Sequence, residues 1–465
     1  MKKITAVLLS ILLLASSLPI SALAAEASGA SEAVAADIVK TEPETTDSVT
    51  QPIENTTTAE KTAVDEKPTE ATPAKAAEPV GAKQEEQPVG KSSFTYTVAN
   101  NQVTITGLSD EYLTDLVIPE TIEDLPVTAI KDYAFNGCSQ ITSITVPNSV
   151  TSIGNGAFYG TKPTKVTLPF IGNKRGQTAS YSSVFGYIFG GTNSSSTETT
   201  TQNYSSSNSD SSYYFIPKTI KEVVITDETI IPYGAFYNCN WIEKIDINEN
   251  VTELGIYSFY NCSSLHSFTI PNLITEIKFR TFYNCEALKN IVVPDTLTKY
   301  GEGSFSGCTS LENIPLPNEL TSIGSAAFSG CSALVNTNLV IPNNVTTIGS
   351  YAFSGCSNIS NITVPTSVTT IGRGAFYGTN PSKISLPFIG LSRTESNGAA
   401  GVFGYIFGYE NLQTTDSIGT FQCSYYVQYM GDYYCYYFIP KTIKEVIITD
   451  ATQIPYHAFY NCDCL

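Results

Sequence analysis

A phenylalanine that recurs every 23 residues constrains this chain more than any other feature. Phe135 and Phe158 lie 23 residues apart. After an interruption, the same spacing separates the successive residues Phe236, Phe259, Phe282, Phe305 and Phe328. The next steps are 25 residues to Phe353 and 23 residues to Phe376. A period in the twenties with one short strand per unit predicts a solenoid whose repeats bury one continuous apolar column.

The stretch ITSITVPNSVTSIGNGAFYG, residues 141–160, is one complete repeat. Its strand lies before Pro147, and alternation directs Ile144 and Val146 inward and the small polar residues between them outward. Proline has no N–H to donate, so Pro147 ends the strand. Strands stacked about 4.8 Å apart in successive repeats form a parallel sheet. The return segment, residues 150–158, adds further apolar side chains to the column.

The repeat pattern L/I-x-x-I-x-I/V-P-x-x-V/L-T-x-I-G-x-x-A/S-F-x-x-C occurs nearly in full at Leu311 to Cys331, and at Ile359 to Thr379 with Thr in place of Cys. It resembles the BspA-like leucine-rich repeat family of bacterial surface antigens from about Leu116 to the C-terminus. The resemblance implies a leucine-rich-repeat horseshoe, with a parallel sheet of short strands on the concave face and turns or short helical turns on the convex face. It also implies a secreted or cell-surface protein, since some members are adhesins for fibronectin, fibrinogen or neighbouring bacteria.

The first 24 residues have the features of a signal peptide. Lys2 and Lys3 precede an apolar run over residues 4–18, and small residues around Ala24 suit cleavage after it. We therefore expect a secreted or cell-surface protein with no membrane insertion after signal removal. Residues 25–92 are rich in Thr, Glu, Pro and Ala without periodicity, which predicts a disordered stalk. This segment is either a spacer or a merely solubilising extension.

The repeats begin after an N-terminal cap, residues 93–126. Phe94 to Gly107 alternates around Ala99-Asn100-Asn101 and predicts a β-hairpin that covers the open first repeat. Residues 116–118 form the first strand before Pro119. Leucine-rich repeats of about 23 residues then occupy residues 127–465, with insertions at 173–212 and 391–435.

The two insertions belong to a duplicated block, because VFGYIFG occurs at 184–190 and again at 402–408. Long insertions in solenoids often emerge on a binding face. One hypothesis makes their aromatic residues adhesive loop tips: Phe185, Tyr187, Phe189, Phe403, Tyr405 and Phe407. The alternative is that these segments pack back over the neighbouring repeats, and the rarity of exposed apolar patches favours it.

The outward strand positions are the other candidate binding surface. We single out five of them, Lys244, Asp246, Asn290, Asn313 and Asn361. They form either a recognition surface or a merely solvated one. No pair of carboxylates and no Ser or Cys beside a base recurs among the outward positions, so the sequence indicates a non-catalytic protein without catalytic residues.

Eight of the eleven cysteines stand three residues after the phenylalanine. Equivalent residues of successive repeats have parallel Cβ atoms about 4.8 Å apart, beyond the roughly 3.5–4.5 Å of a disulfide. We therefore expect buried thiols. Cys423 and Cys435 lie in the second insertion, where a disulfide between them is a separate hypothesis. The absence of a CxxC pair and the presence of only two histidines argue against a metal site, and we expect no cofactor.

The net charge of −18 excludes nucleic acid as a partner, because no basic patch is available to displace counterions from phosphates. The leading hypothesis is a secreted or cell-surface adhesin or interaction scaffold that recognises host or neighbouring-cell proteins. By the family resemblance, these partners are extracellular proteins of matrix or plasma type. The alternative is a glycan- or cell-wall-binding accessory region of a larger extracellular enzyme or assembly.

Overall fold

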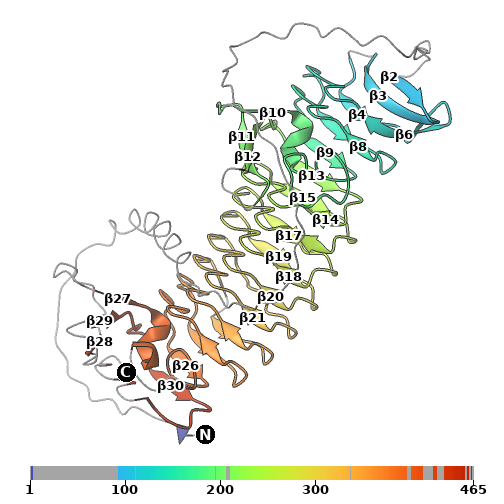
Figure 1. Cartoon of the computed structure of the whole chain (residues 1–465). Helices are drawn as coiled ribbons and strands as arrows, with labels where there is room; N and C mark the ends of the chain where they lie inside the picture. Colours follow the sequence, from blue (N-terminus) through green and yellow to red (C-terminus); the bar gives the residue numbers. More distant parts are fainter. Residues whose placement is uncertain are drawn as a thin grey trace, which may run out of the picture. The chain divides into compact units, whose positions relative to one another are not determined.

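The computed structural model shows how the repeats stack. It describes residues 2–3, 93–109, 112–193, 195–205, 210–335, 337–394, 399–411, 423–426, 434–455, 458, 459, 462 and 465. The predicted signal peptide beyond Lys3 and the predicted stalk therefore lie outside the described residues. Figure 1 shows the repeats one above another, with short strands aligned along the stack.

The first strand column consists of parallel strands, most of which lie just before a conserved proline. Its members are β4 (Asp115–Val117), β7 (Ser143–Thr145), β9 (Lys165–Leu168), β13 (Glu222–Ile225), β15 (Lys244–Ile247), β17 (Ser267–Thr269), β19 (Asn290–Val292), β22 (Asn338–Val340), β24 (Asn361–Thr363), β26 (Lys383–Leu386) and β30 (Glu445–Ile448). They pair in chain order as β4 to β15, β17 with β19, and β22 to β30. The short strand β1 (Lys2–Lys3) pairs antiparallel with β30.

The return segments form a second strand column, which the sequence did not predict. It contains β6 (Leu125–Ile130), β8 (Ser152–Ile153), β14 (Ile230–Ile231), β16 (Glu253–Leu254), β18 (Glu276–Ile277), β20 (Lys299–Tyr300), β21 (Ser322–Ile323), β23 (Thr347–Ile348) and β25 (Thr370–Ile371). Most of these strands have two residues, too few for an alternation pattern to be read. In the described residues helix occurs only in the insertions, as the 3₁₀ segments η2 (Phe185–Phe189), η3 (Ala399–Gly401) and η4 (Phe403–Phe407). The predicted leucine-rich-repeat solenoid is confirmed.

The core between the two columns is a stack of phenylalanine rings. Phe282 is fully buried, with its ring 5.0 Å from that of Phe259 and 5.1 Å from that of Phe305. Six of the eight ladder cysteines are buried thiols, as predicted, whereas Cys138 and Cys462 are half-buried. The Sγ of Cys308 donates to the carbonyl of Phe282 in the preceding repeat at 3.1 Å. Burial raises the pKa of Cys356 to about 12, so this thiol stays protonated.

The glycine that follows the second-column strand is needed for close packing. Gly349 and Gly372 do not adopt positive φ angles. A Cβ atom at Gly349 would lie 2.3 Å from the backbone nitrogen of Ser325, and one at Gly372 would lie 2.2 Å from that of Ser350. Close packing, and not a left-handed turn, therefore favours glycine at these positions.

The predicted N-terminal hairpin is present. β2 (Phe94–Ala99) pairs antiparallel with β3 (Gln102–Leu108). Their connection uses Asn100 and Asn101 with φ angles of 50° and 60°, a conformation that asparagine tolerates. β3 then pairs parallel with β6, and β5 (Thr121–Ile122) pairs antiparallel with β6. The hairpin thus covers the first edge of the second strand column.

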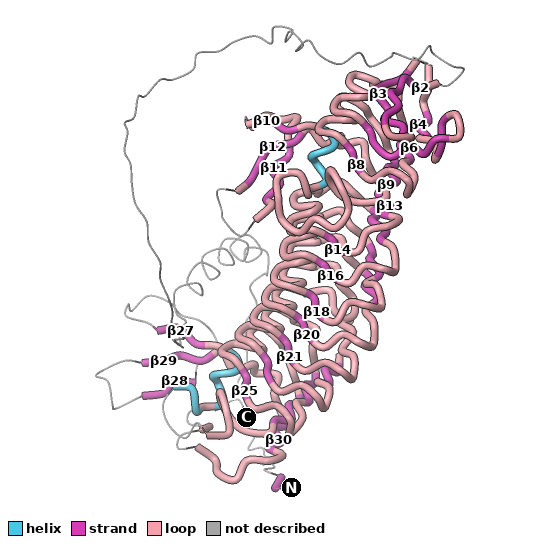
Figure 2. The backbone as a smooth tube through the Cα atoms, turned by 45° about the vertical axis from the view of Figure 1, so that its right-hand side comes forward, coloured by secondary structure: helices cyan, strands magenta, loops and turns pink. Residues whose placement is uncertain are grey.

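Each insertion adds a small antiparallel sheet beside the solenoid (Figure 2). The first consists of β10 (Gly191–Thr192), β11 (Thr200–Asn203) and β12 (Ser211–Tyr214). The second consists of β27 (Tyr409–Asn411), β28 (Cys423–Tyr426) and β29 (Tyr434–Tyr437). Cys423 pairs with Tyr437 and Cys435 with Tyr425, so the two cysteines are not directly opposed. Their side chains lie outside the description, and the disulfide stays a prediction.

The aromatic segments of the insertions belong to the core, which corrects the hypothesis of adhesive loop tips. Phe185, Phe189, Phe403 and Phe407 have no exposed surface, Tyr187 is 9% exposed, and Tyr405 is half-buried. The rings of Phe185 and Phe236 lie 5.1 Å apart. The backbone of η2 accepts a hydrogen bond from the N–H of Phe158 at 2.9 Å and donates one to the carbonyl of Ala235 at 2.9 Å. η2 therefore fills the place of a repeat in the phenylalanine column, which is the alternative that the sequence favoured.

Candidate functional site

The outward side of the first strand column, here called the strand face, carries the predicted binding residues. Lys244 and Asp246 are both exposed and form an ion pair at 2.6 Å. Lys244 also lies 3.3 Å from Glu222, which Lys165 contacts at 3.2 Å from the other side. Burial acts to raise the pKa of Glu222, but hydrogen bonds from the two lysines outweigh it and hold that pKa below its usual value. This part of the face has alternating, mutually compensated charges.

A row of asparagines follows along the strand face, at the first strand position of successive repeats. Asn290 and Asn313 are exposed, while Asn361 is half-buried. The Nδ2 of Asn361 donates to Oδ1 of Asn338 at 2.6 Å. Asn338 belongs to the same row but was not predicted. Its repeat is two residues longer than the others, which obscured the register in the sequence.

The hydrogen-bonded ladder of the strand face is interrupted between β15 and β17 and again at residues 314–316. The interruption at residues 314–316 is here called the ladder gap. In other repeats the residue before the conserved proline donates to the next repeat, as the N–H of Ile270 does to the carbonyl of Val292 at 2.9 Å. Among the described residues, no backbone hydrogen bond of this kind forms from Val293 or Leu316. Pro315 occupies a strand position and has no N–H, so the ladder cannot continue through it.

Tyr300 compensates for part of the interruption from the opposite side of the core. Its hydroxyl donates to the carbonyl of Pro315 at 2.5 Å. Tyr300 is fully buried in the second strand column, at a position where the neighbouring repeats carry Ile277 and Ile323. Burial raises its pKa strongly, so the hydroxyl remains a donor. The tyrosine and the proline are therefore a matched departure from the repeat pattern.

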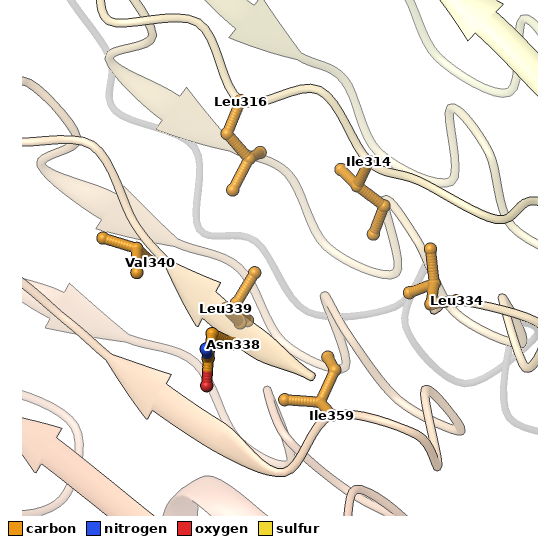
Figure 3. Close-up of a pocket in the computed structure, with 7 residues that line it drawn as sticks. All are labelled: Ile314, Leu316, Leu334, Asn338, Leu339, Val340 and Ile359. Atoms are coloured by element: carbon orange, nitrogen blue, oxygen red, sulfur yellow. The ribbon is translucent and has the colours of Figure 1, made fainter. Parts of the chain in front are cut away.

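An apolar hollow of about 130 Å³ opens at the ladder gap (Figure 3). Its lining comes from three successive repeats: Ile314 and Leu316, then Leu334, Asn338, Leu339 and Val340, and finally Ile359. Three valines around it have more than half of their surface exposed: Val292 at 59%, Val335 at 59% and Val340 at 60%. The hollow and the valines form an apolar area beside the asparagine row of the strand face.

The edge of β22 that borders the gap has unpaired backbone groups. The N–H of Ile341 donates to Thr363 on the far side at 2.9 Å. Since alternate residues of a strand bond to opposite neighbours, Val340 directs its N–H and C=O toward residues 314–316. Within the described part of the chain, no backbone hydrogen bond joins Val340 to those residues. The site thus offers a free donor and acceptor beside an apolar hollow and a row of amides.

This arrangement suits recognition rather than chemistry. In the described residues, no group of three or more His, Cys, Asp or Glu side chains could hold a metal ion. The helices of the same residues include none that is long and apolar enough to cross a membrane. The polar groups at the gap are backbone amides and asparagines, which bind but do not activate a nucleophile or transfer protons at neutral pH.

Comparison with known proteins identifies the family. A family model described as the BspA type leucine-rich repeat region matches residues 108–229, 229–339 and 334–465, with six copies. These matches cover most of the chain. The chain belongs to the BspA-type leucine-rich repeat family. The resemblance expected from the repeat unit is confirmed, and the homologues are repeat proteins of a non-catalytic family.

The solved structures that match the chain include other bacterial leucine-rich repeat proteins, with TM-scores below 0.5. A leucine-rich repeat protein from Bacteroides ovatus is 20% identical, with 65% of this chain and 95% of that chain covered and a TM-score of 0.33. A leucine rich cell surface protein from Faecalibacterium prausnitzii is 21% identical, with 61% and 90% covered and a TM-score of 0.25. A leucine-rich repeat protein from Eubacterium ventriosum is 22% identical, with 64% and 86% covered and a TM-score of 0.29. No curated protein gives a significant match.

Proposed function

We propose that this BspA-type protein is an extracellular adhesin or interaction scaffold that binds an extended segment of a partner protein at the ladder gap. Proteins of the family are typically secreted or located at the cell surface. The observation that carries the proposal is the interrupted ladder, because it leaves a strand edge unpaired in the middle of the strand face. An unpaired strand edge is a template for another chain.

The geometry of the gap favours an extended peptide. A partner strand that pairs with the β22 edge supplies a donor and an acceptor to Val340, which is the mode of recognition known as β-strand addition. The hollow of about 130 Å³ is close to the roughly 150 Å³ of a dry cavity that binds benzene, so it accommodates one apolar side chain of the partner. Asn338 lines the hollow, and Asn290 and Asn313 belong to the same row on the strand face, so these residues offer amides to the partner's polar groups.

The partners we propose are host matrix or plasma proteins, or surface proteins of neighbouring cells. The charge of the chain affects which of these partners it can attract. The chain has a net charge of −18, and the lysines of the strand face are paired with carboxylates. Electrostatic attraction therefore contributes little to the association with an acidic partner. Apolar contact at Val292 and Val340 supplies most of the affinity.

The test is a binding measurement on immobilised extracellular proteins, including fibronectin and fibrinogen, with the purified full chain in solution. Val340→Asp places a charge at the hollow and should weaken binding about tenfold or more, the equivalent of about 1.4 kcal/mol. Val117→Asp is the matched control, since Val117 is 57% exposed at the same strand position in β4, far along the column from the gap. Equal binding by the two variants, or no protein binding by the wild type, would refute the proposal.

A further inference from the structure

A second surface departs from the repeat pattern, although the fold does not require this departure. After the core phenylalanine, three successive repeats carry the pair Tyr-Asn, in the loops that follow β14, β16 and β18 (Figure 2). We call this surface the tyrosine–asparagine patch. It comprises Tyr237, Asn238, Tyr260, Asn261, Tyr283 and Asn284, together with Tyr257 and Arg280.

Other repeats of the same chain show what replaces these Tyr-Asn pairs. In the next three repeats the same two positions are Ser-Gly, beginning with Ser306-Gly307. The backbone is equivalent in both sets, because Asn284 has a φ of 56° and Gly307 a φ of 79°. Both loops also bond in the same way to the following repeat: the N–H of Asn284 donates to Ser306 at 2.8 Å and that of Gly307 to Ser329 at 2.7 Å. The fold therefore does not require the Tyr-Asn pairs.

The patch keeps residues that cost stability. Glycine adopts a left-handed conformation freely, whereas other residues pay about 1–2 kcal/mol, with asparagine at the lower end. Tyr257 and Arg280 are also left-handed, with φ angles of 58° and 49°, but this is shared with Tyr133, Ala326 and Tyr351 at the same position of repeats outside the patch. The equivalent residue of the next repeat is Gly303, so glycine is compatible with this position. Two residues after the core phenylalanine, however, the left-handed non-glycine residues of the described repeats are the three asparagines of the patch, which suggests a functional requirement there.

The side chains of the patch form an ordered array. The rings of Tyr237 and Tyr260 stack at 4.6 Å, and those of Tyr260 and Tyr283 at 5.0 Å. Tyr257 packs edge-on against Tyr260 at 5.3 Å. Because the stacked rings cover each other's faces, they present mainly edges and hydroxyls to solvent. The array repeats at about the 4.8 Å spacing of the strands.

Hydrogen-bonding groups surround the stacked rings. The Nδ2 of Asn261 donates to Oδ1 of Asn238 at 2.9 Å, which forms an amide row beside the rings. The guanidinium of Arg280 lies 5.1 Å from the centre of the Tyr283 ring and makes no ion pair in the described residues. Burial raises the pKa of Tyr260 to about 12 and also raises that of Tyr237 and Tyr257, so the hydroxyls remain protonated donors at neutral pH.

We infer that the tyrosine–asparagine patch binds a glycan chain. Hydroxyls, amides and a guanidinium at a regular spacing match the hydroxyl-rich, repetitive surface of a polysaccharide. An apolar peptide segment fits less well, because the ring faces it would need are covered by neighbouring rings. The patch lies on the loops and the ladder gap on the strands, so different residues form the two sites.

The experiment is affinity electrophoresis of the full chain in gels that contain a neutral polysaccharide, such as a β-1,4-glucan, or an acidic one, such as polygalacturonate. Retardation by either polymer is the expected result. The Tyr260→Ser/Asn261→Gly variant imports the pair found at residues 306–307 and should reduce the affinity about tenfold, while circular dichroism stays unchanged. Arg280→Gly, which imports the residue found at position 303, should weaken binding as well.

Tyr377→Ser is the matched control, because Tyr377 occupies the same repeat position outside the patch and is followed by Gly378. This variant should keep the wild-type retardation. No retardation by any polysaccharide would overturn the inference, and so would equal retardation of the wild type and the Tyr260→Ser/Asn261→Gly variant. The inference would also be overturned if an acidic peptide bound at the patch and no glycan did. None of these outcomes affects the Val340 test of protein binding.

Discussion

Removal of a single oxygen atom tests how the solenoid tolerates the ladder gap. In Tyr300→Phe, the ring keeps its core contacts at 5.8 Å from Phe305 and 4.8 Å from Phe328, and only the hydroxyl is lost. The carbonyl of Pro315 then has no donor, since the hydroxyl bond of 2.5 Å is its hydrogen bond in the described structure. A fully buried acceptor left unsatisfied costs about 1–3 kcal/mol, and this bond is part-buried, so the lower end of that range applies. We expect a loss of stability within that range.

The assay combines urea unfolding of the full chain with hydrogen exchange of the repeats around the gap. The unfolding midpoint should fall in Tyr300→Phe. Exchange should speed up in residues 289–294 and 312–317, which border the interruption, while repeats far from it keep their protection. This local pattern is expected because each repeat of a solenoid contacts mainly its neighbours.

A double-mutant cycle sharpens the test. Pro315→Thr restores an N–H at residue 315 and installs the residue found at the same position in β7, β17 and β24. If the ladder then closes, Val293 supplies a donor to the carbonyl of residue 315, and the hydroxyl of Tyr300 matters less. The cost of Tyr300→Phe should therefore be smaller in the Pro315→Thr background, by about 0.5–2 kcal/mol. Equal costs in both backgrounds, or no cost in either, would refute the coupling of the two residues.

Three further predictions concern the scaffold. Phe282→Ala removes a fully buried ring from the middle of the stack and should cost about 3–5 kcal/mol in urea unfolding. Gly349→Ala should cost more than Gly330→Ala, because a Cβ at Gly349 would lie 2.3 Å from backbone, whereas one at Gly330 (φ 79°) meets nothing closer than 3.6 Å and adds only about 1–2 kcal/mol of backbone strain. Burial raises the pKa of Glu228 above 4.5, so wild-type stability should fall as pH rises from about 4.5 through the folded pKa, and Glu228→Gln should remove that part of the pH dependence.

The fold was predictable because each repeat carries the same pattern of residues. The 23-residue spacing of Phe236, Phe259 and Phe282 fixed both the stacking and the identity of the buried column. Lys131 and Lys278 stand where other repeats carry Gly349 and Gly372, which agrees with a glycine that serves close packing and not a left-handed turn. The second strand column escaped prediction, since a two-residue strand such as Ser152–Ile153 has no alternation to detect.

The site was only partly predictable. Asn290, Asn313 and Asn361 were placed correctly on the outward side by alternation alone. The ladder gap was missed, although Pro315 in a strand position is a recognisable signal. Its partner Tyr300 could not be found from the sequence, because the bond between them crosses the core from one strand column to the other.

Departures from the repeat pattern are where function is best sought in this protein. A residue that matches the pattern, such as Phe282, is explained by packing alone. Pro315 and Asn261 both work against the scaffold, the first by removing a ladder donor and the second by adopting a conformation that glycine holds more easily. The repeats beside them show that a residue better suited to the fold is available at each position. Such costs persist only if something other than folding selects for them, so the ladder gap and the tyrosine–asparagine patch are the surfaces to test first for ligands.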